Sequence, residues 1–231
     1  MNLIDFYEDV LKWNFFGGNQ LSTDNIENRY LVLVKEESNE IFEGVEEKDH
    51  ILFLDGLCDT LVVTSFLCAV QKNYKNEILL NDYQIAKQTN NFEFFISELK
   101  ALKGYVPKKL ENESDHLKSL QLIKINSFCI LKLVESYIQS FDIDYVGACF
   151  EVMRSNWSKY PLVSETNPEF EKHYIESQGR YKNITYTVKT DSEGNDRYIF
   201  KDEKNKIVKP SKFSDPDLKP FLTERFLSLE L

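Results

Sequence analysis

The stretch ILFLDGLCDTLVVTSFLCAV at residues 51–70 decides the fold, because it is apolar enough to be buried on every side of a helix. It nevertheless carries two aspartates, Asp55 and Asp59, which lie about one helical turn apart. An ionised carboxylate that leaves water costs several kcal/mol unless a cation or a dense set of donors meets it. The sequence therefore predicts a buried helix whose two carboxylates face a metal ion.

A group of acidic residues precedes this stretch, in the segment LVLVKEESNEIFEG at residues 31–44. On a helix Glu36, Glu37 and Glu40 fall within one narrow sector, so their carboxylates share a face. Glu37 also has apolar residues one turn before it and one turn after it, which places it on the side that faces the core. Glutamate is rarely buried, so this placement indicates a function.

The two helices are expected to be antiparallel neighbours, because the link between them, from Gly44 to Asp49, is short. Gly44 is expected to end the first helix and Asp49 to cap the second. Counted from this link, Glu37 and Asp55 lie at similar heights of roughly 9 to 10 Å. Four or five acidic side chains then surround one cavity, and such an oxygen donor set suits Mg²⁺ or Mn²⁺.

Two structural alternatives stand beside the metal site. The acidic spacing EExxE is common on solvated helix faces, and Asp55 with Asp59 could form a buried hydrogen-bonded pair. These two aspartates are the only charged residues between Asp49 and Lys72, so their helix has no polar face to place them on. This favours the metal site over both alternatives.

The composition restricts the class of protein. At 231 residues and 27.2 kDa the chain can bury one sizeable core, and its net charge of −10 disfavours binding to nucleic acid. The four cysteines lie in apolar surroundings without a CxxC pair, so we expect reduced core thiols. The amino terminus lacks a signal-peptide pattern, and two aspartates disfavour a membrane span. We expect a cytoplasmic protein without nucleic-acid or membrane partners.

Other catalytic motifs do not occur in the sequence. The three histidines, His50, His116 and His173, are scattered and form no zinc motif. The chain has no GxxxxGK[ST] phosphate loop, and DSEGND lacks the ligand pattern of an EF-hand. The carboxylates therefore carry the only strong chemical signal.

The helical periodicity extends through the first two-thirds of the chain. It predicts a first helix ending before Gly17, a second from Thr23 or Asp24, a third over about 50–73, and further helices at 81–103, 116–139 and 142–159. After Pro161 the pattern alternates, and the turn residues DSEGND separate two strand candidates. We expect an all-α helical bundle with a small C-terminal β-hairpin appendage. We expect residues 1–160 to form the helical, catalytic core, with a helical addition at about 81–139, and residues 161–231 to form the hairpin and an extended tail packed on that core.

The order K-EESNE-I, short link, LDGLCDTLVV resembles the all-α nucleoside triphosphate pyrophosphohydrolase superfamily, which includes MazG-like proteins, dimeric dUTPases and phosphoribosyl-ATP pyrophosphohydrolases. Its hallmark is EExxE on one helix and ExxD on the next. Glu36, Glu37 and Glu40 match the first motif. Asp59 matches the last acid of the second, but Gly56 stands three residues earlier and the nearest acid is Asp55.

Two later segments, EVMRSNWSKYP at 151–161 and KNKIVKPSKFSDPDL at 204–218, resemble longer bacterial and phage members of this superfamily. In those members Arg, Asn and Lys side chains approach the substrate phosphates. The resemblance therefore implies a substrate-binding role for Arg154, Asn156, Lys159, Lys206 and Lys209; the alternative is ordinary surface placement. Among the aromatic residues that could stack on a base we favour Trp13, although a core or interface position is equally open.

The resemblance implies hydrolysis of a nucleoside triphosphate between its α and β phosphates, in a bacterial cell or a phage-infected host. Mg²⁺, or Mn²⁺, would be held by Glu37, Glu40, Asp55 and Asp59, and Glu36 would orient or deprotonate the attacking water. The superfamily and the apolar third helix together indicate a homodimer or a higher homo-oligomer. The alternative is a non-catalytic helical module that senses nucleotide or binds a protein partner. The preferred base cannot be derived from the sequence.

Overall fold

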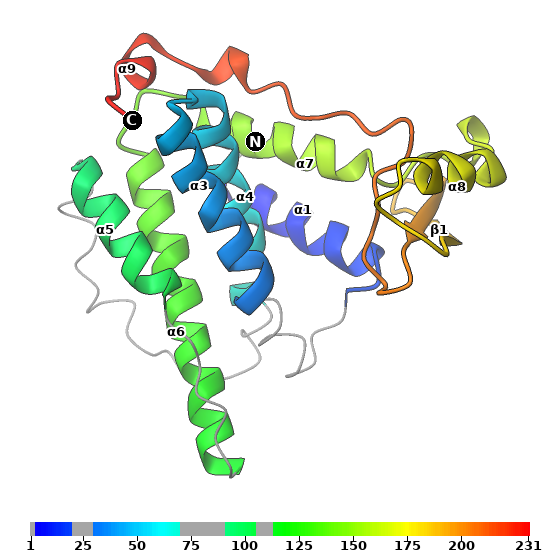
Figure 1. Cartoon of the computed structure of the whole chain (residues 1–231), viewed down its shortest axis with the longest axis horizontal. Helices are drawn as coiled ribbons and strands as arrows, with labels where there is room; N and C mark the ends of the chain where they lie inside the picture. Colours follow the sequence, from blue (N-terminus) through cyan, green and yellow to red (C-terminus); the bar gives the residue numbers. More distant parts are fainter. Residues whose placement is uncertain (1–2, 20–29, 70–90, 105–112) are drawn as a thin grey trace. The chain divides into compact units, whose positions relative to one another are not determined.

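The computed structural model describes residues 3–19, 30–69, 91–104 and 113–231. It confirms the predicted all-α bundle with a small C-terminal β-hairpin (Figure 1). The chain divides into two compact units. The first unit comprises Met1–Leu11, Gln20–Cys149 and Leu218–Leu231, and the second comprises Lys12–Asn19 and Phe150–Asp217. The predicted boundary at residue 160 falls inside the second unit.

The first unit is built from helices. Its elements, with α1 and α7 running on into the second unit, are α1 (Leu3–Phe16), the π-helical turn η1 (Tyr30–Val34), α3 (Lys35–Glu47), α4 (His50–Ala69), α5 (Phe92–Lys103), α6 (Glu113–Ile138), α7 (Tyr145–Trp157), η5 (Lys219–Phe221) and α9 (Glu224–Leu227). Helices α3, α4 and α6 lie side by side (Figure 1). The predicted helix start at Thr23 or Asp24 and the segments 70–73 and 81–90 lie outside the described residues.

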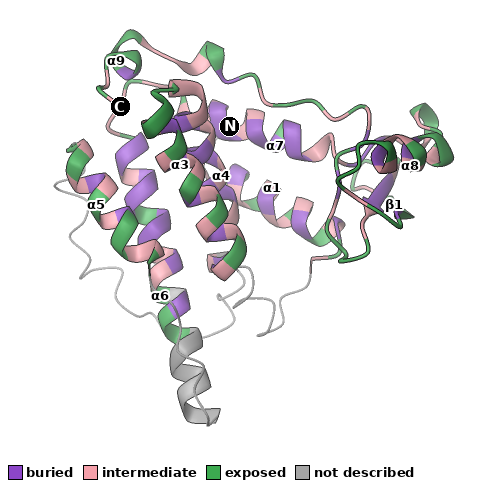
Figure 2. Ribbon diagram, in the orientation of Figure 1, coloured by how far each residue is buried: buried purple, intermediate pink, exposed green. Residues whose placement is uncertain are grey.

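Helix α4 is the centre of this unit, as its sequence predicts. Each of its residues from His50 to Cys68 is buried or half-buried (Figure 2). This helix is long and apolar enough to cross a membrane, yet 67% of its most apolar window is buried against the rest of the protein. Asp49 caps it, since its Oδ1 accepts hydrogen bonds from the backbone N–H groups of Ile51 and Leu52 at 2.8 and 3.1 Å.

The expected stop at Gly44 is wrong. Helix α3 continues to Glu47 and ends at Lys48, whose φ of 56° turns the chain in the left-handed region. Gly44 instead lies against α4, where a β-carbon on it would stand 2.5 Å from the backbone nitrogen of Phe53. The glycine is therefore required by helix contact and not by the end of the helix.

Aromatic rings from α4, α5, α6 and α9 pack together in the first unit. Phe95 of α5 stacks on Tyr137 of α6 with their ring centroids 3.9 Å apart, and Phe226 of α9 packs 6.0 Å from Phe53 of α4. The ring of His50 lies 3.2 Å from the carbonyl oxygen of Leu229. The last residues of the chain thus pack on the helical core, although the sequence did not indicate α9.

The four cysteines are free thiols, as predicted. Burial is the main cause that raises the pKa of Cys68 to about 12, and the neighbouring Cys129 adds to this effect. The pKa of Cys58 is raised by a hydrogen bond with Cys149 and by burial. These thiols contribute to packing in their protonated form.

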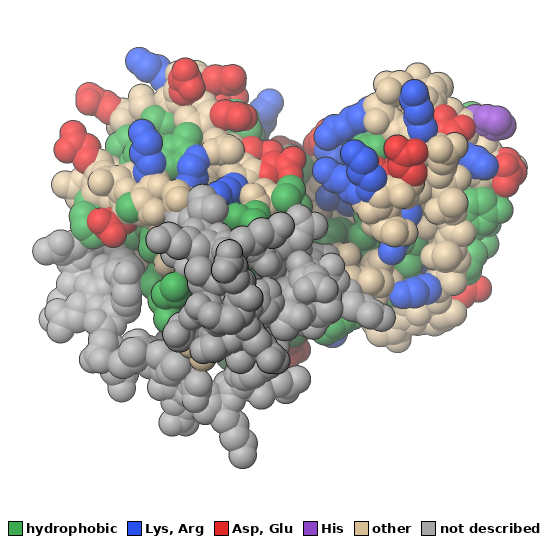
Figure 3. All heavy atoms as spheres, turned by 60° about the horizontal axis from the view of Figure 1, so that its bottom comes forward, with side chains coloured by type: hydrophobic (Ala, Val, Ile, Leu, Met, Phe, Trp, Pro, Cys, Tyr) green, Lys and Arg blue, Asp and Glu red, His purple; other side chains and the backbone are tan. Residues whose placement is uncertain are grey.

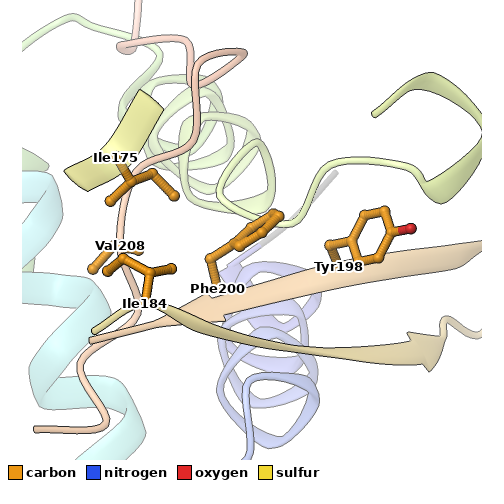
Figure 4. Packing of buried hydrophobic residues seen from close by; sticks show 5 residues of the cluster. All are labelled: Ile175, Ile184, Tyr198, Phe200 and Val208. Atoms are coloured by element: carbon orange, nitrogen blue, oxygen red, sulfur yellow. The ribbon is translucent and has the colours of Figure 1, made fainter. Parts of the chain in front are cut away.

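The second unit contains the hairpin. Strands β1 (Thr185–Thr190) and β2 (Asp196–Lys201) pair antiparallel with Thr187 opposite Ile199, and the short turn η4 (Val163–Glu165) precedes them. Sequence analysis missed helix α8 (Pro168–Ser177), which Asn167 caps through its side chain. The sequence features that could have indicated this helix are Asn167-Pro168 at its start and the apolar Ile175 on its buried face. A small core packs α8 on the hairpin (Figure 4) and consists of Ile175, Ile184, Tyr198, Phe200 and Val208.

Candidate metal centre

Helices α3 and α4 bring three carboxylates together in the first unit. One carboxylate oxygen from each of Glu37, Glu40 and Asp59 lies within 4.8 Å of the others. All three side chains are half-buried. Two oxygens on opposite sides of an octahedral Mg²⁺ are about 4 Å apart, because each Mg–O bond is about 2 Å long. The limit of 4.8 Å is slightly wider than this, and carboxylate oxygens are the donors that a hard divalent cation prefers, so small side-chain adjustments would let the three bind one ion.

Close contact between the two helices explains this spacing. A β-carbon on Gly56 would stand 2.7 Å from the backbone nitrogen of Ile41 and 3.0 Å from the carbonyl carbon of Glu40. The matching contact at Gly44 meets the backbone of Phe53. Both glycines allow one helix backbone to touch the other, so side chains from α3 and α4 reach each other over a short gap.

The same contacts define the alignment of the helices. Gly44 lies level with Phe53 and Ile41 with Gly56, so Asp59 is level with the turn of α3 that carries Glu37 and Glu40. The sequence analysis placed Asp55 there. That prediction is one turn off, because α3 runs past Gly44 and the chain reverses at Lys48.

The other two predicted acids lie outside this group. Asp55 is half-buried one turn before Asp59, and its Oδ1 atom is buried, but it is not one of the three carboxylates that converge. Glu36 is exposed on the neighbouring sector of α3. Its predicted role as a base stays a prediction.

Gly56 stands at a position where side-chain volume is excluded by helix contact. The resemblance expects an acid at this position, three residues before Asp59. A carboxylate side chain cannot fit there while the helix backbones touch. In this chain Gly56 instead allows the backbones that carry Glu40 and Asp59 to approach each other.

Three of the predicted substrate-binding residues lie together in the second unit. The Nε1–H of Trp13 donates to the carbonyl oxygen of Asn156 at 2.9 Å. The ammonium group of Lys159 donates to Oδ1 of Asn156 at 2.6 Å and lies 5.5 Å from the centre of the Trp13 ring. The ring of Tyr160 also stacks on the ring of Trp13, with the two centroids 5.6 Å apart.

Phe213 joins Lys209 to these residues. The Nζ atoms of Lys209 and Lys159 lie 4.0 and 5.8 Å from the centre of its ring. Cations are attracted to the face of an aromatic ring, so Phe213 draws both ammonium groups toward it. Lys209 also forms an ion pair with Asp215 at 3.6 Å. Sequence analysis did not select Phe213, although it lies within the KPSKFSDPDL segment.

Arg154 and Lys206 are placed differently. Both Nε and Nη2 of Arg154 donate to Glu151, at 2.8 and 2.7 Å, and Nη2 also donates to the carbonyl oxygen of Asp215 at 2.9 Å. The hydrogen bond from Arg154 is the main cause that lowers the pKa of Glu151. Lys206 is exposed, and its backbone N–H donates to Asp202. Arg154 thus holds the backbone at Asp215, the residue whose carboxylate pairs with Lys209.

The carboxylates and the cations belong to separate units. The first unit holds the convergent triad of Glu37, Glu40 and Asp59, and the second holds Trp13, Asn156, Lys159 and Lys209 around Phe213. The geometry of each group is internal to its own unit. No known protein family, curated protein or solved structure compared with the chain gave a match.

Proposed function

We propose that this protein is a divalent-metal-dependent nucleoside triphosphate pyrophosphohydrolase. It would cleave a (d)NTP between the α and β phosphates to give the monophosphate and pyrophosphate. The observation that carries the proposal is the convergence of Glu37, Glu40 and Asp59 from two antiparallel helices. A buried helix rarely carries an acid without a cation or donors to meet it, so the triad favours a cation site over surface decoration.

The proposed roles follow from the donor chemistry. Glu37, Glu40 and Asp59 would hold Mg²⁺ or Mn²⁺, with Asp55 behind them on α4. When bound, the cation would neutralise phosphate charge and lower the pKa of a coordinated water. Glu36, exposed next to Glu37, would accept a proton from the attacking water.

The proposed roles of Lys159, Lys209 and Trp13, which lie in the second unit, rest on the resemblance and on the chemistry of that unit alone. Lys159 and Lys209 are both held beside aromatic rings, and such ammonium groups suit the negative oxygens of a triphosphate. Trp13 is the proposed stacking surface for a base. Its Nε1–H is engaged by Asn156 and the ring of Tyr160 stacks on it, so a base would meet the part of the ring that Tyr160 does not cover.

The test is a panel of (d)NTPs incubated with Mg²⁺ or Mn²⁺ while pyrophosphate release is measured. We expect release by the wild type and loss of activity by a factor of at least about 10² in Glu37→Gln and Asp59→Asn. Glu43→Gln is the matched control, because Glu43 is an exposed acid of the same helix. Wild-type activity in the Asp59→Asn variant, or no release from any nucleotide, would overturn the proposal.

The same panel distinguishes the non-catalytic alternative. Tight binding of a nucleotide without turnover would identify a sensing module on this scaffold.

A homodimer or larger assembly also remains part of the proposal, because Leu122 and Ile125 of α6 are exposed apolar residues about one turn apart. Light scattering is expected to give at least twice the 27.2 kDa mass of the chain.

A further inference from the structure

Two lysines of the hairpin converge on one point in the second unit. The Nζ atoms of Lys201 and Lys189 lie 3.4 and 3.9 Å from the place where a β-carbon on Gly18 would stand. The two ammonium groups are therefore within about 7 Å of each other, where like charges repel. Neither lysine belongs to the substrate-binding residues discussed above.

The backbone makes this convergence unexpected. Lys201 pairs with Thr185 and Lys189 pairs with Arg197, so the two lysines share one face of the hairpin but start from its opposite ends. Their backbones are about 13 Å apart along the strands, at about 3.3 Å per residue. Long charged side chains at opposite ends of a hairpin can easily point apart into solvent. Here they lean inward toward Gly18.

Lys189 and Lys201 form no ion pair with the part of the chain that the structure describes. Lys189 donates a hydrogen bond to the carbonyl oxygen of Phe16 at 2.9 Å, at the end of α1. Burial and the neighbouring Lys189 together lower the pKa of Lys201. Within the described residues neither lysine has a carboxylate in ion-pair contact, whereas Arg197 on the same face is paired with Asp191 at 2.7 Å.

The charge of the second unit agrees with an anionic ligand. This unit holds 13 lysines and arginines against 12 aspartates and glutamates. The whole chain, by contrast, has 28 basic and 38 acidic residues. Lys and Arg side chains gather on one side of it (Figure 3). A small anion with oxygens on two linked phosphates could accept from both ammonium groups at once. Nucleic acid is a poorer match, because a chain with a net charge of −10 repels an extended row of phosphates.

We propose that Lys189 and Lys201, at the Gly18 end of α1, form a binding site for a soluble oligophosphate such as pyrophosphate or a triphosphate chain. The site is independent of divalent metal and of the carboxylate triad. It goes beyond the proposed hydrolysis, since it can exist whether or not the protein turns over nucleotides.

The test measures binding of pyrophosphate to the full chain by calorimetry, in EDTA, at low salt and without phosphate buffer. We expect Lys189→Gln with Lys201→Gln to weaken binding at least about tenfold, because each variant removes a charge-assisted hydrogen bond. Lys182→Gln with Lys204→Gln is the matched control, since it removes the same charge from two exposed lysines beside the hairpin. The control and Asp59→Asn are expected to bind as the wild type does.

Equal affinity in the wild type and the Lys189/Lys201 double variant would overturn the site, as would absence of pyrophosphate binding by a folded wild type. A second arm uses vesicles of phosphatidylcholine with phosphatidic acid. We expect no sedimentation with them, and capture that depends on Lys189 and Lys201 would overturn the assignment to a soluble ligand. Activity in the nucleotide panel is scored separately, so the failure of one proposal does not decide the other.

Discussion

Three carboxylates within 4.8 Å of each other repel when no cation lies between them. Glu37, Glu40 and Asp59 are half-buried, so water screens this repulsion only in part. A bound cation would compensate this repulsion. The balance between repulsion and cation binding can be measured at a single residue.

We predict that Glu40→Gln makes the protein more stable than the wild type in EDTA and less stable in Mn²⁺. In EDTA the variant removes one repelling charge, and in Mn²⁺ it removes one ligand, while the wild type gains stability in proportion to its affinity for the ion. Thermal melts of both proteins in EDTA and in Mn²⁺ measure whether the order of their stabilities reverses. If Mn²⁺ raises the melting temperature of the wild type, Glu40→Gln and the exposed Glu43→Gln control equally, the triad is not the site.

Gly56 determines how near the carboxylates of the two helices come. Replacing a glycine inside a helix by alanine usually stabilises the helix by about 1 kcal/mol. Here the added methyl group would meet the backbone of Ile41 at 2.7 Å, which is closer than two such atoms can lie. The backbones must separate to accept it.

We predict that Gly56→Ala destabilises the protein by about 1–3 kcal/mol, the cost of overpacking, and weakens Mn²⁺ binding. Gly44→Ala is the control, because it makes a similar contact with Phe53 nearer the chain reversal and farther from Asp59. It should lose stability with a smaller loss of Mn²⁺ affinity. Denaturant unfolding and electron paramagnetic resonance of Mn²⁺ measure the two effects. Wild-type stability of Gly56→Ala would show that the helices do not touch there.

At the scale of elements, the hairpin turn depends on one aspartate. Asp191 accepts from the backbone N–H groups of Glu193 and Asn195 at 2.9 Å each and from Nε of Arg197 at 2.7 Å. Arg197 in turn donates to the carbonyl oxygen of Tyr160 at 2.9 Å. The hydrogen bond from Arg197 is the largest cause that lowers the pKa of Asp191 to about 2. The turn is therefore tied to the segment before η4 through a charged pair.

We predict that Asp191→Asn destabilises the hairpin at pH 7 and that the difference from the wild type disappears near pH 2. The pKa of Asp191 is lower in the folded protein than the value of about 3.9 in an unfolded chain. Its stabilising contribution is thus complete above about pH 4 and is lost as the pH falls toward 2. Hydrogen exchange of the β1 and β2 amides over this range measures it. A difference that stays constant down to pH 2 would contradict the ionic role.

At the scale of the whole molecule, charge is divided between the two units. The second unit is close to neutral, with 13 basic and 12 acidic residues, and the first unit carries a net charge of −11, with 15 basic and 26 acidic residues. A cation is therefore expected to bind the first unit and an anion the second.

We predict that the two ligands protect different amides from hydrogen exchange. Mn²⁺ should slow exchange in α3 and α4, while pyrophosphate in EDTA should slow it at residues 12–19 and in the hairpin. Mass spectrometry of peptides from the intact protein resolves these regions. The Glu37→Gln variant should lose only the first effect. Protection of the same peptides by both ligands would contradict the division of charge.

By itself the sequence determined most of the elements, because helical periodicity, alternation and turn residues are local patterns. It identified the buried helix from its unbroken apolar run, the cap at Asp49 and the hairpin around DSEGND. It also placed Glu37 and Glu40 on the inner side of α3. It missed α8 and α9, whose short apolar patterns are completed by residues far away in the chain.

Only the tertiary structure decided which residues meet. The triad contains Asp59 and not Asp55, because the alignment of α3 and α4 depends on the reversal at Lys48 and on backbone contact at Gly44 and Gly56. The contact of Trp13 with Lys159 was likewise decided by packing. These residues are far apart in the chain, and a contact between distant segments produces no periodic pattern in the sequence.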